Sequence, residues 1–160
     1  MFERPAWDTA AACTIVRPSA LYGPRCISRR VGQVFIESAL HGLPLRIEGD
    51  GSDRLDFTYV DDLVHGLSLV IARPEARGET FNLTYGGSRT IAEVAEIMRS
   101  SFPDVALEHV ERDRLMPVRG TLSVEKARRL IGYEPQNPVE VGFPQYIDWY
   151  RTLVPAPALR

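Results

Sequence analysis

The chain has 160 residues, of which 44% are hydrophobic, and its formal net charge is −2. A chain of this length buries about two thirds of its unfolded surface, so a single core and one domain are expected. The near-neutral charge excludes the broad positive field that holds a nucleic acid, although local arginine clusters could still bind a small anion.

Cysteine use and hydropathy indicate the compartment. Cys13 and Cys26 are the only cysteines, too few for the disulfide framework of a secreted scaffold and without C-x-x-C spacing. Charges and a proline interrupt residues 1–12, and no later segment approaches the roughly 20 apolar residues of a membrane span. We therefore expect a soluble, cytoplasmic protein with no membrane partner.

Strands and helices alternate in the first part of the chain. Residues 13–16 form a β-rich run that Pro18 ends, which predicts a buried strand whose carboxyl end opens into a loop. Open α/β sheets bind ligands at such ends. Apolar residues at helical spacing predict a helix from about Arg29 to His41, and a strand is expected over residues 45–48.

A glycine turn, a second strand over residues 55–60 and a helix follow. Asp61 or Asp62 is expected to cap this helix, which ends near Pro74. Its predicted apolar stripe consists of Leu63, Val64, Leu67, Val70 and Ile71.

The last third is mostly helical after a strand over residues 80–84. Thr90 and Glu93 form a capping box that opens a helix. Its expected buried face consists of Ile91, Val94, Ala95 and Met98. Ser123 is the expected N-cap of the next helix and Gly132 its end, and a final helix covers about 139–153.

The polar motifs contain no known metal-ligand pattern and leave the role of one arginine open. His41, His65 and His109 have no second ligand at metal spacing, so no metal is expected. The glycines of the turn at 49–51 most simply permit positive φ. Arg54 beside that turn suits a phosphate or carboxylate, and the alternative is an exposed, solvated arginine.

Five motifs in chain order resemble one protein family. They are "RPSALYGPR", "GDGSDRLDFTYVDD", "ETFNLTYGG", "PVRGTLSVEKARRLIGYEP" and "GFPQYIDWYR". In this order and spacing the chain resembles the C-terminal half of the extended short-chain dehydrogenase/reductases, the NAD-dependent sugar epimerase/dehydratase family, from about Ala11 to Leu153.

The resemblance implies an α/β fold, made of the end of a Rossmann-type parallel sheet and the small C-terminal substrate-binding domain. It implies NAD as the cofactor of the intact enzymes and a nucleotide sugar of the UDP or dTDP type as substrate. The residues that it assigns are Pro18 and Ser19 beside the cofactor and Tyr22, Arg25, Arg46, Glu48, Arg54 and Arg119 around the substrate. Among these, Arg54 and Arg119 are the candidates for the phosphates: Arg119 matches the family's position, whereas Arg54 lies one residue before the family's usual arginine. Arg46 and Glu48 flank the base.

The chain departs from the family at four places. The family's glycine-rich NAD motif is not present, and its Tyr-x-x-x-Lys pair is missing because Leu122 stands four residues before Lys126, the only lysine. Ala20 replaces a usual asparagine, and Leu55 replaces a usual arginine. We therefore expect no catalytic residue, and expect residues 1–160 to be a single fragment whose N-terminal NAD-binding part is missing.

Three functions stay open. The first is the substrate pocket of an NAD-dependent nucleotide-sugar epimerase or dehydratase of carbohydrate biosynthesis, an isomerase or oxidoreductase. The second is a non-catalytic sugar-nucleotide-binding module, and the third is an inactive gene remnant. The expected protein partner is either a second copy or a missing N-terminal half. For Arg119, the alternative to phosphate is an ion pair with Asp56 or Glu111.

We predict that the chain alone neither turns over substrate nor binds NAD appreciably, because the sequence offers no phosphate-cradling helix start and no catalytic pair. Calorimetric titration with NAD measures the binding directly. A micromolar dissociation constant would overturn this expectation.

Overall fold

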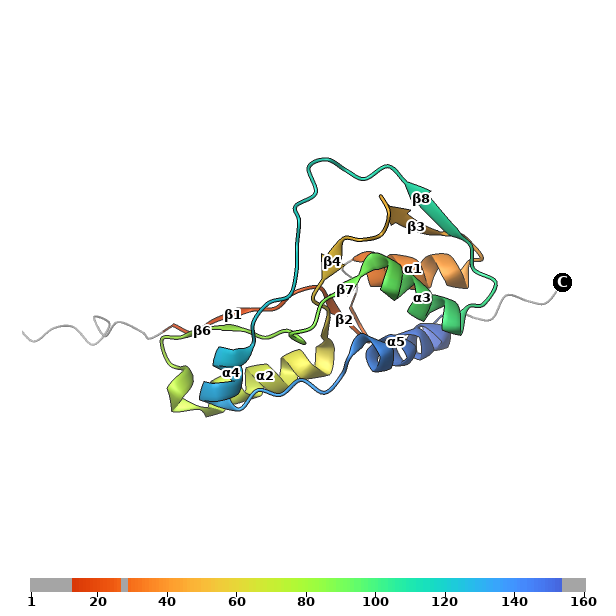
Figure 1. The fold of residues 1–160 in the computed structure, drawn as a ribbon. Helices are drawn as coiled ribbons and strands as arrows, with labels where there is room; N and C mark the ends of the chain where they lie inside the picture. The colour runs from red at the N-terminus through yellow and green to blue at the C-terminus, as the bar shows by residue number, and fades with distance from the viewer. Residues whose placement is uncertain (1–12, 27–28, 154–160) are drawn as a thin grey trace, which may run out of the picture.

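The computed structural model describes residues 13–26 and 29–153. Its elements in chain order are β1 (Ile15–Arg17), β2 (Leu21–Tyr22), α1 (Val31–Leu40), β3 (Leu45–Glu48), β4 (Arg54–Leu55), β5 (Thr58–Tyr59), α2 (Val60–Ala72), η2 (Pro74–Ala76), β6 (Thr80–Asn82), β7 (Arg89–Thr90), α3 (Ile91–Ser101), β8 (Leu107–Val110), α4 (Glu125–Ile131) and α5 (Val139–Leu153). Figure 1 shows β1, β6, α2 and α4 at one end and α1, α3 and α5 at the other.

The described strands pair two by two. The pairs β1–β6, β2–β5 and β3–β8 are parallel, and β4–β7 is antiparallel. Three of the four pairs therefore need a crossover connection, which is typical of α/β proteins. The α/β fold class expected from the sequence is confirmed.

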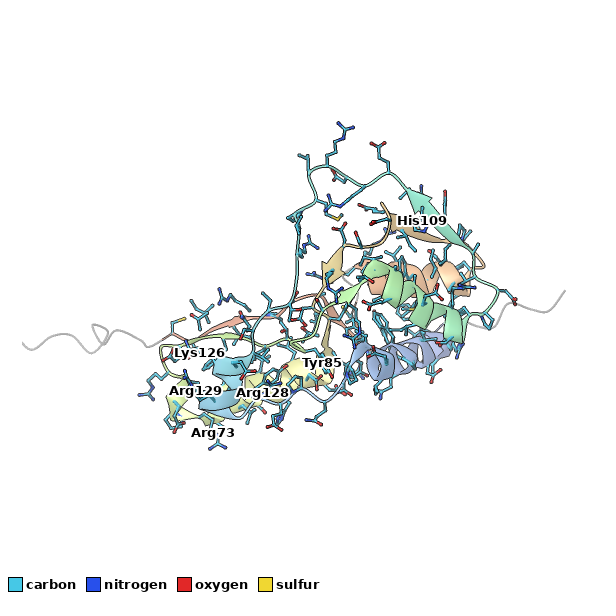
Figure 2. The ribbon with its side chains drawn as sticks, viewed as in Figure 1. Arg73, Tyr85, His109, Lys126, Arg128 and Arg129 are labelled. Atoms are coloured by element: carbon cyan, nitrogen blue, oxygen red, sulfur yellow. The ribbon has the colours of Figure 1, made fainter. Side chains whose placement is uncertain are left out.

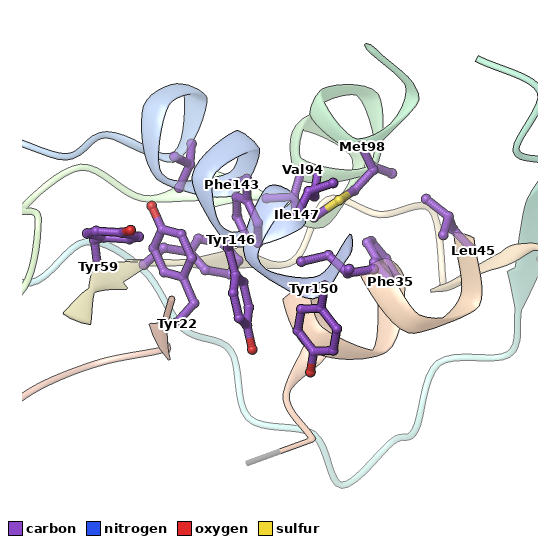
Figure 3. Close-up of a cluster of buried hydrophobic side chains, with 14 of the residues drawn as sticks. Tyr22, Phe35, Leu45, Tyr59, Val94, Met98, Phe143, Tyr146, Ile147 and Tyr150 are labelled. Carbon is purple, nitrogen blue, oxygen red and sulfur yellow. The ribbon is translucent and has the colours of Figure 1, made fainter. Parts of the chain in front are cut away.

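Aromatic rings fill the larger of two cores. Tyr22 stacks on Phe143 with ring centroids 4.4 Å apart, and Figure 3 shows both beside Tyr146. A Cβ added to Gly32 would lie 2.6 Å from the Phe143 ring, and one added to Gly142 would lie 2.2 Å from the Tyr22 hydroxyl oxygen. The contacts of α1 and α5 with these rings therefore require glycine.

The smaller core joins β6, α2, η2 and α4. Phe81, Leu83 and Tyr133 are fully buried in it. The Tyr133 hydroxyl donates to the carbonyl oxygen of Thr84 at 3.1 Å. A Cβ on Gly66 would lie 2.8 Å from Leu83, so α2 approaches this core through a glycine.

Several predicted features are confirmed. Thr90 and Glu93 form the reciprocal capping box of α3, and α5 has the expected bounds. Gly132 ends α4 in the left-handed conformation with φ of 72°. In the turn between β3 and β4, Gly49 and Gly51 have φ of 62° and 79°.

The first strand is not buried, contrary to prediction. Ile15 is 53% exposed, and Arg17 is exposed as well. Within the described residues β1 pairs with β6 alone, so its second edge has no partner strand there. A parallel pair of this kind lacks the cover that parallel sheets usually have on both faces.

The single strand predicted over residues 55–60 is two strands. β4 pairs with β7, whereas β5 pairs with β2, and Asp56 and Phe57 lie between them. The Asp56 carboxylate is fully buried and accepts bonds from other segments, so the chain changes partners at this residue.

Both aspartate caps predicted for α2 are wrong. The N-cap is Tyr59, which makes no side-chain cap bond. Asp62 is buried and instead accepts bonds from the backbone N–H groups of Gln136 and Asn137 and from the Asn137 amide, at 2.9, 3.0 and 2.9 Å. Its carboxylate therefore fastens α2 to the segment that leads into α5.

Two other helix starts differ from the prediction. The N-cap of α4 is Val124, while Ser123 one residue earlier accepts from the N–H of Glu125 at 3.4 Å. Helix α1 begins at Val31 rather than near Arg29, because Arg29 has a positive φ of 45°, which is not helical.

Of the five residues in the predicted apolar stripe of α2, two are partly buried and three are exposed. Leu63 and Val70 pack partly against the smaller core, but Val64, Leu67 and Ile71 are 59%, 38% and 86% exposed. The face that α2 buries is centred on Asp62 and Gly66. Buried polar bonding and a close backbone approach therefore decide how the helix is oriented.

We predict that Asp62→Ala lowers the free energy of unfolding by about 3 kcal/mol, because two backbone N–H groups lose a charged acceptor. Asp61→Ala is the matched control, since Asp61 lies in the same first turn but is exposed. It should cost about 0.5 kcal/mol, the usual helix-dipole contribution. Urea unfolding of both variants measures the difference, and equal losses would contradict the role of Asp62.

We also predict self-association through the second edge of β1, because such edges are templates for strand pairing. Sedimentation velocity should show a mass that rises with concentration, and Ile15→Lys should reduce that rise. A monodisperse monomer with a cooperative melt above roughly 65 °C, the upper end for ordinary domains, would count against this prediction.

Candidate functional site

The structure has a cleft of about 1250 Å³. Its walls are the residues around β1 and β2, the start of α1, the turn between β3 and β4, and the segment that joins β8 to α4. The cleft is lined by Arg29, Arg30, Arg46, Arg54, Arg112, Arg114 and Arg119, and by the acids Glu48, Asp53, Glu111 and Asp113. Positive side chains outnumber negative ones, which suits an anionic ligand.

Most residues assigned from the family resemblance come together in this cleft. Those that line it are Pro18, Ser19, Tyr22, Arg46, Glu48, Arg54 and Arg119. Arg25 is not among the lining residues; it is exposed and has a positive φ of 67°.

Arg54 is held in place by Ser88. Its Nε donates to the Ser88 hydroxyl at 3.0 Å and its Nη2 to the Ser88 carbonyl at 2.9 Å. Thr121 donates to the same hydroxyl at 2.7 Å. These bonds leave Nη1 of Arg54 without a described protein acceptor, so a fixed guanidinium stands at the cleft with donor capacity to spare.

Arg119 differs from Arg54 in having no fixed partner. It is exposed, and no hydrogen bond or salt bridge joins it to another residue in the described ranges, although its charge adds to the lowering of the Asp53 pKa after that from Arg112. Neither predicted alternative partner is engaged with it: Glu111 lies 3.9 Å from Arg114, and Asp56 accepts three other bonds. The whole guanidinium fork of Arg119 is therefore available to a ligand.

Strand β3 carries the two residues assigned to the base. Leu45 and Ile47 point into the core, so Arg46 and Glu48 alternate to the other face. Arg46 lies 3.5 Å from Glu108 on the neighbouring β8, with both side chains largely exposed. Glu48 accepts weakly from the Asp113 N–H at 3.5 Å, which brings β3 near the segment after β8.

Tyr22 belongs to the core as much as to the cleft. It is 3% exposed, and burial raises the pKa of its phenol far above the usual value, with smaller contributions from Asp62 and Tyr59. Its hydroxyl has no hydrogen-bond partner within the described chain. The phenol is therefore neutral and supports the cleft through packing.

Pro18 and Ser19 form a wall of the cleft without phosphate-binding features. Pro18 has no N–H to donate, and the Ser19 carbonyl already accepts from Thr58 at 2.6 Å. Within the described residues no glycine-rich turn opens a helix, and the residues just before α1 and α2 are Arg30 and Tyr59. Pro18, Ser19 and these two helix starts therefore do not fit the diphosphate of NAD, and no step of NAD chemistry is assigned to them.

Sequence reasoning missed the pair formed by Asp53 and Arg112. Arg112 Nε donates to Asp53 Oδ2 at 2.6 Å and Nη2 to Oδ1 at 3.0 Å. The bonds from Arg112 hold the pKa of Asp53 below its usual value, and Asp53 raises the pKa of Arg112. The strand β8 before Arg112 was also missed, although "LEHV" has apolar ends that could have indicated it.

The histidines do not gather at the cleft. His109, labelled in Figure 2, lies on β8 with Nδ1 2.8 Å from the Gly49 carbonyl oxygen. Among residues 13–26 and 29–153 no three His, Cys, Asp or Glu side chains are placed to hold a metal ion. In the same residues, no helix has the length and apolar character to cross a membrane.

Comparison with protein families matches residues 3–84 to the NAD dependent epimerase/dehydratase family. UDP-glucuronic acid decarboxylase 4 of Arabidopsis thaliana is 33% identical over 143 residues, which cover 88% of this chain and 32% of that protein. The chain spans less than half the length of the first curated relatives that it matches.

Solved structures show the same architecture. Epimerase Mth375 of Methanothermobacter thermautotrophicus aligns with a TM-score of 0.81 at 32% identity, covering 87% of this chain and 43% of that one. UDP-glucose 4-epimerase of Thermotoga maritima, solved with UDP-glucose, aligns with a TM-score of 0.80 at 25% identity, covering 88% and 46%. More than half of each relative thus has no counterpart in these 160 residues.

Proposed function

The chain belongs to the NAD-dependent epimerase/dehydratase family, and from that premise we propose that its cleft binds the diphosphate and base of a nucleotide sugar. The observation that carries the proposal is the pairing of a fixed arginine, Arg54, with an unpartnered one, Arg119, in a single arginine-rich cleft. Two guanidinium forks suit a diphosphate, because each can engage phosphate oxygens through two parallel charge-assisted bonds.

The size and chemistry of the cleft support this ligand class. A volume of about 1250 Å³ exceeds the roughly 300–1,000 Å³ of drug-sized sites and leaves room for a sugar beside a nucleotide. Arg46 and Glu48 offer a donor and an acceptor for the edge of a base, and Tyr22 supports the wall between base and sugar. A relative solved with UDP-glucose has the same fold over nearly all of this chain.

The chemistry is proposed to lie outside these residues. The cleft brings together no tyrosine–lysine pair, because Lys126 is on α4 and pairs with Glu79. Pro18 and Ser19 would then border a nicotinamide held by another polypeptide segment, either an N-terminal NAD-binding part or a separate subunit. Arg25, outside the cleft here, would join the site only with that segment present. The proposed compartment is the cytoplasm.

We predict that Arg119→Ala weakens UDP binding by about 1.5 to 3 kcal/mol, the usual worth of a charged hydrogen bond, or roughly 10- to 150-fold. Arg119→Lys should recover only part of the loss, since an ammonium group cannot reproduce the fork. Calorimetric titration with UDP measures each variant. In a chain joined to an NAD-binding part, NAD affinity should not change.

The control is Arg129→Ala, which removes the same charge from the exposed surface of α4, where Figure 2 labels Arg129; this residue is not among those that line the cleft. Its UDP affinity should equal that of the wild type. If Arg119→Ala also binds UDP as tightly as the wild type, Arg119 is not a phosphate ligand and Arg54 is the remaining candidate.

A further inference from the structure

Residues 111–121, called the strap here, cross the cleft between β8 and α4 as the long loop at the top of Figure 1. The strap supplies several of the lining residues, including Arg119. It is poorly packed, since Leu115 and Val118 are 90% and 89% exposed. Core burial therefore does not explain why the strap stands over the cleft.

Polar bonds to the two flanks of β4 fix the ends of the strap. At one end Arg112 is bound to Asp53, just before β4. At the other end Asp56, just after β4, accepts from the N–H of Leu122 at 3.0 Å, and Thr121 bonds to Ser88. Between these two anchors, no described hydrogen bond joins residues 114–120 to a core element.

The first anchor also organises the strap itself. Arg112 Nη2 donates to the Met116 carbonyl at 3.0 Å, and Nη1 donates to the Asp113 carbonyl at 3.2 Å. All three nitrogens of this guanidinium are thus occupied by protein acceptors. These bonds use four of the five N–H donors of Arg112, and a phosphate could engage its Nε–Nη2 edge only by displacing Asp53, so this edge is placed to hold the strap.

We propose that Asp53 is a positioning residue: through Arg112 it orders the strap and holds Arg119 at the cleft before the ligand arrives. This inference rests on the proposed function, because the residue that is held in position is Arg119, the proposed phosphate ligand. Ordering the strap in advance removes an entropic cost that nucleotide binding would otherwise bear. Asp53 itself does not contact the nucleotide.

Limited trypsin digestion of the 160-residue chain tests the ordering without reference to function. Cleavage after Arg114 and Arg119, followed by mass spectrometry, should be about tenfold faster in Asp53→Asn than in the wild type, because the tethered strap opens more often. Asp50→Asn is the matched control: Asp50 lies in the same turn, is exposed and bonds only to Ser52. It should be cleaved at the wild-type rate.

UDP titration tests the consequence for binding. Asp53→Asn should raise the dissociation constant about tenfold, and Asp50→Asn should not. The exchanged pair, Asp53→Arg with Arg112→Asp, should restore part of the protease resistance and of the UDP affinity, since the charge pair is rebuilt with the partners reversed while the bonds to the Met116 and Asp113 carbonyls are lost. Restoration is the readout that separates positioning from direct contact, because an aspartate at position 112 cannot bind phosphate.

Each result decides a separate question. Unchanged digestion in a folded Asp53→Asn variant would overturn the proposal. An exchanged pair that resists trypsin but does not bind UDP would overturn it as well, because Arg112 would then be a direct ligand. A wild-type chain that does not bind UDP contradicts the proposed function instead. In that event the digestion still decides whether Asp53 orders the strap.

Discussion

One buried carboxylate joins the parts of this molecule. Asp56 is fully buried and accepts bonds from the Thr84 hydroxyl and from the N–H groups of Gly86 and Leu122, at 3.0, 3.1 and 3.0 Å. The bonds connect the junction of β4 and β5 with the loop after β6 and with the end of the strap. Because a buried carboxylate is tolerated only when its acceptor sites are filled, these three segments are held in one relative position.

The site depends on that position. Arg54 lies two residues before Asp56, and its guanidinium reaches Ser88, which Thr121 also contacts. The cleft wall, the strap end and the aromatic core therefore meet around β4. The two-residue strand β4 thus has a carboxylate on each flank, Asp53 and Asp56, while it stays paired with β7.

The sequence predicted elements whose signals are local. The capping box of Thr90 and Glu93 and the left-handed Gly132 need only neighbouring residues, and both are confirmed. The failures arise from distant partners. The local sequence around Asp62 is that of a helix cap, and only the fold shows that its partners are residues 136 and 137. Asp53 likewise has no recognisable role in the sequence, because its partner Arg112 lies 59 positions later. The grouping of assigned residues in the cleft came from the family resemblance, since periodicity alone could not have placed Arg46 near Arg119.

The central claim is that the arginine-lined cleft binds a nucleotide diphosphate through Arg54 and Arg119. The most direct measurement is a titration of the isotope-labelled chain with UDP, followed through the Nε–Hε resonances of its arginines by NMR. Saturable shifts are expected for Arg54 and Arg119, and none for Arg128 and Arg129 on α4. Shifts confined to the α4 arginines, or none at millimolar UDP, would contradict this claim.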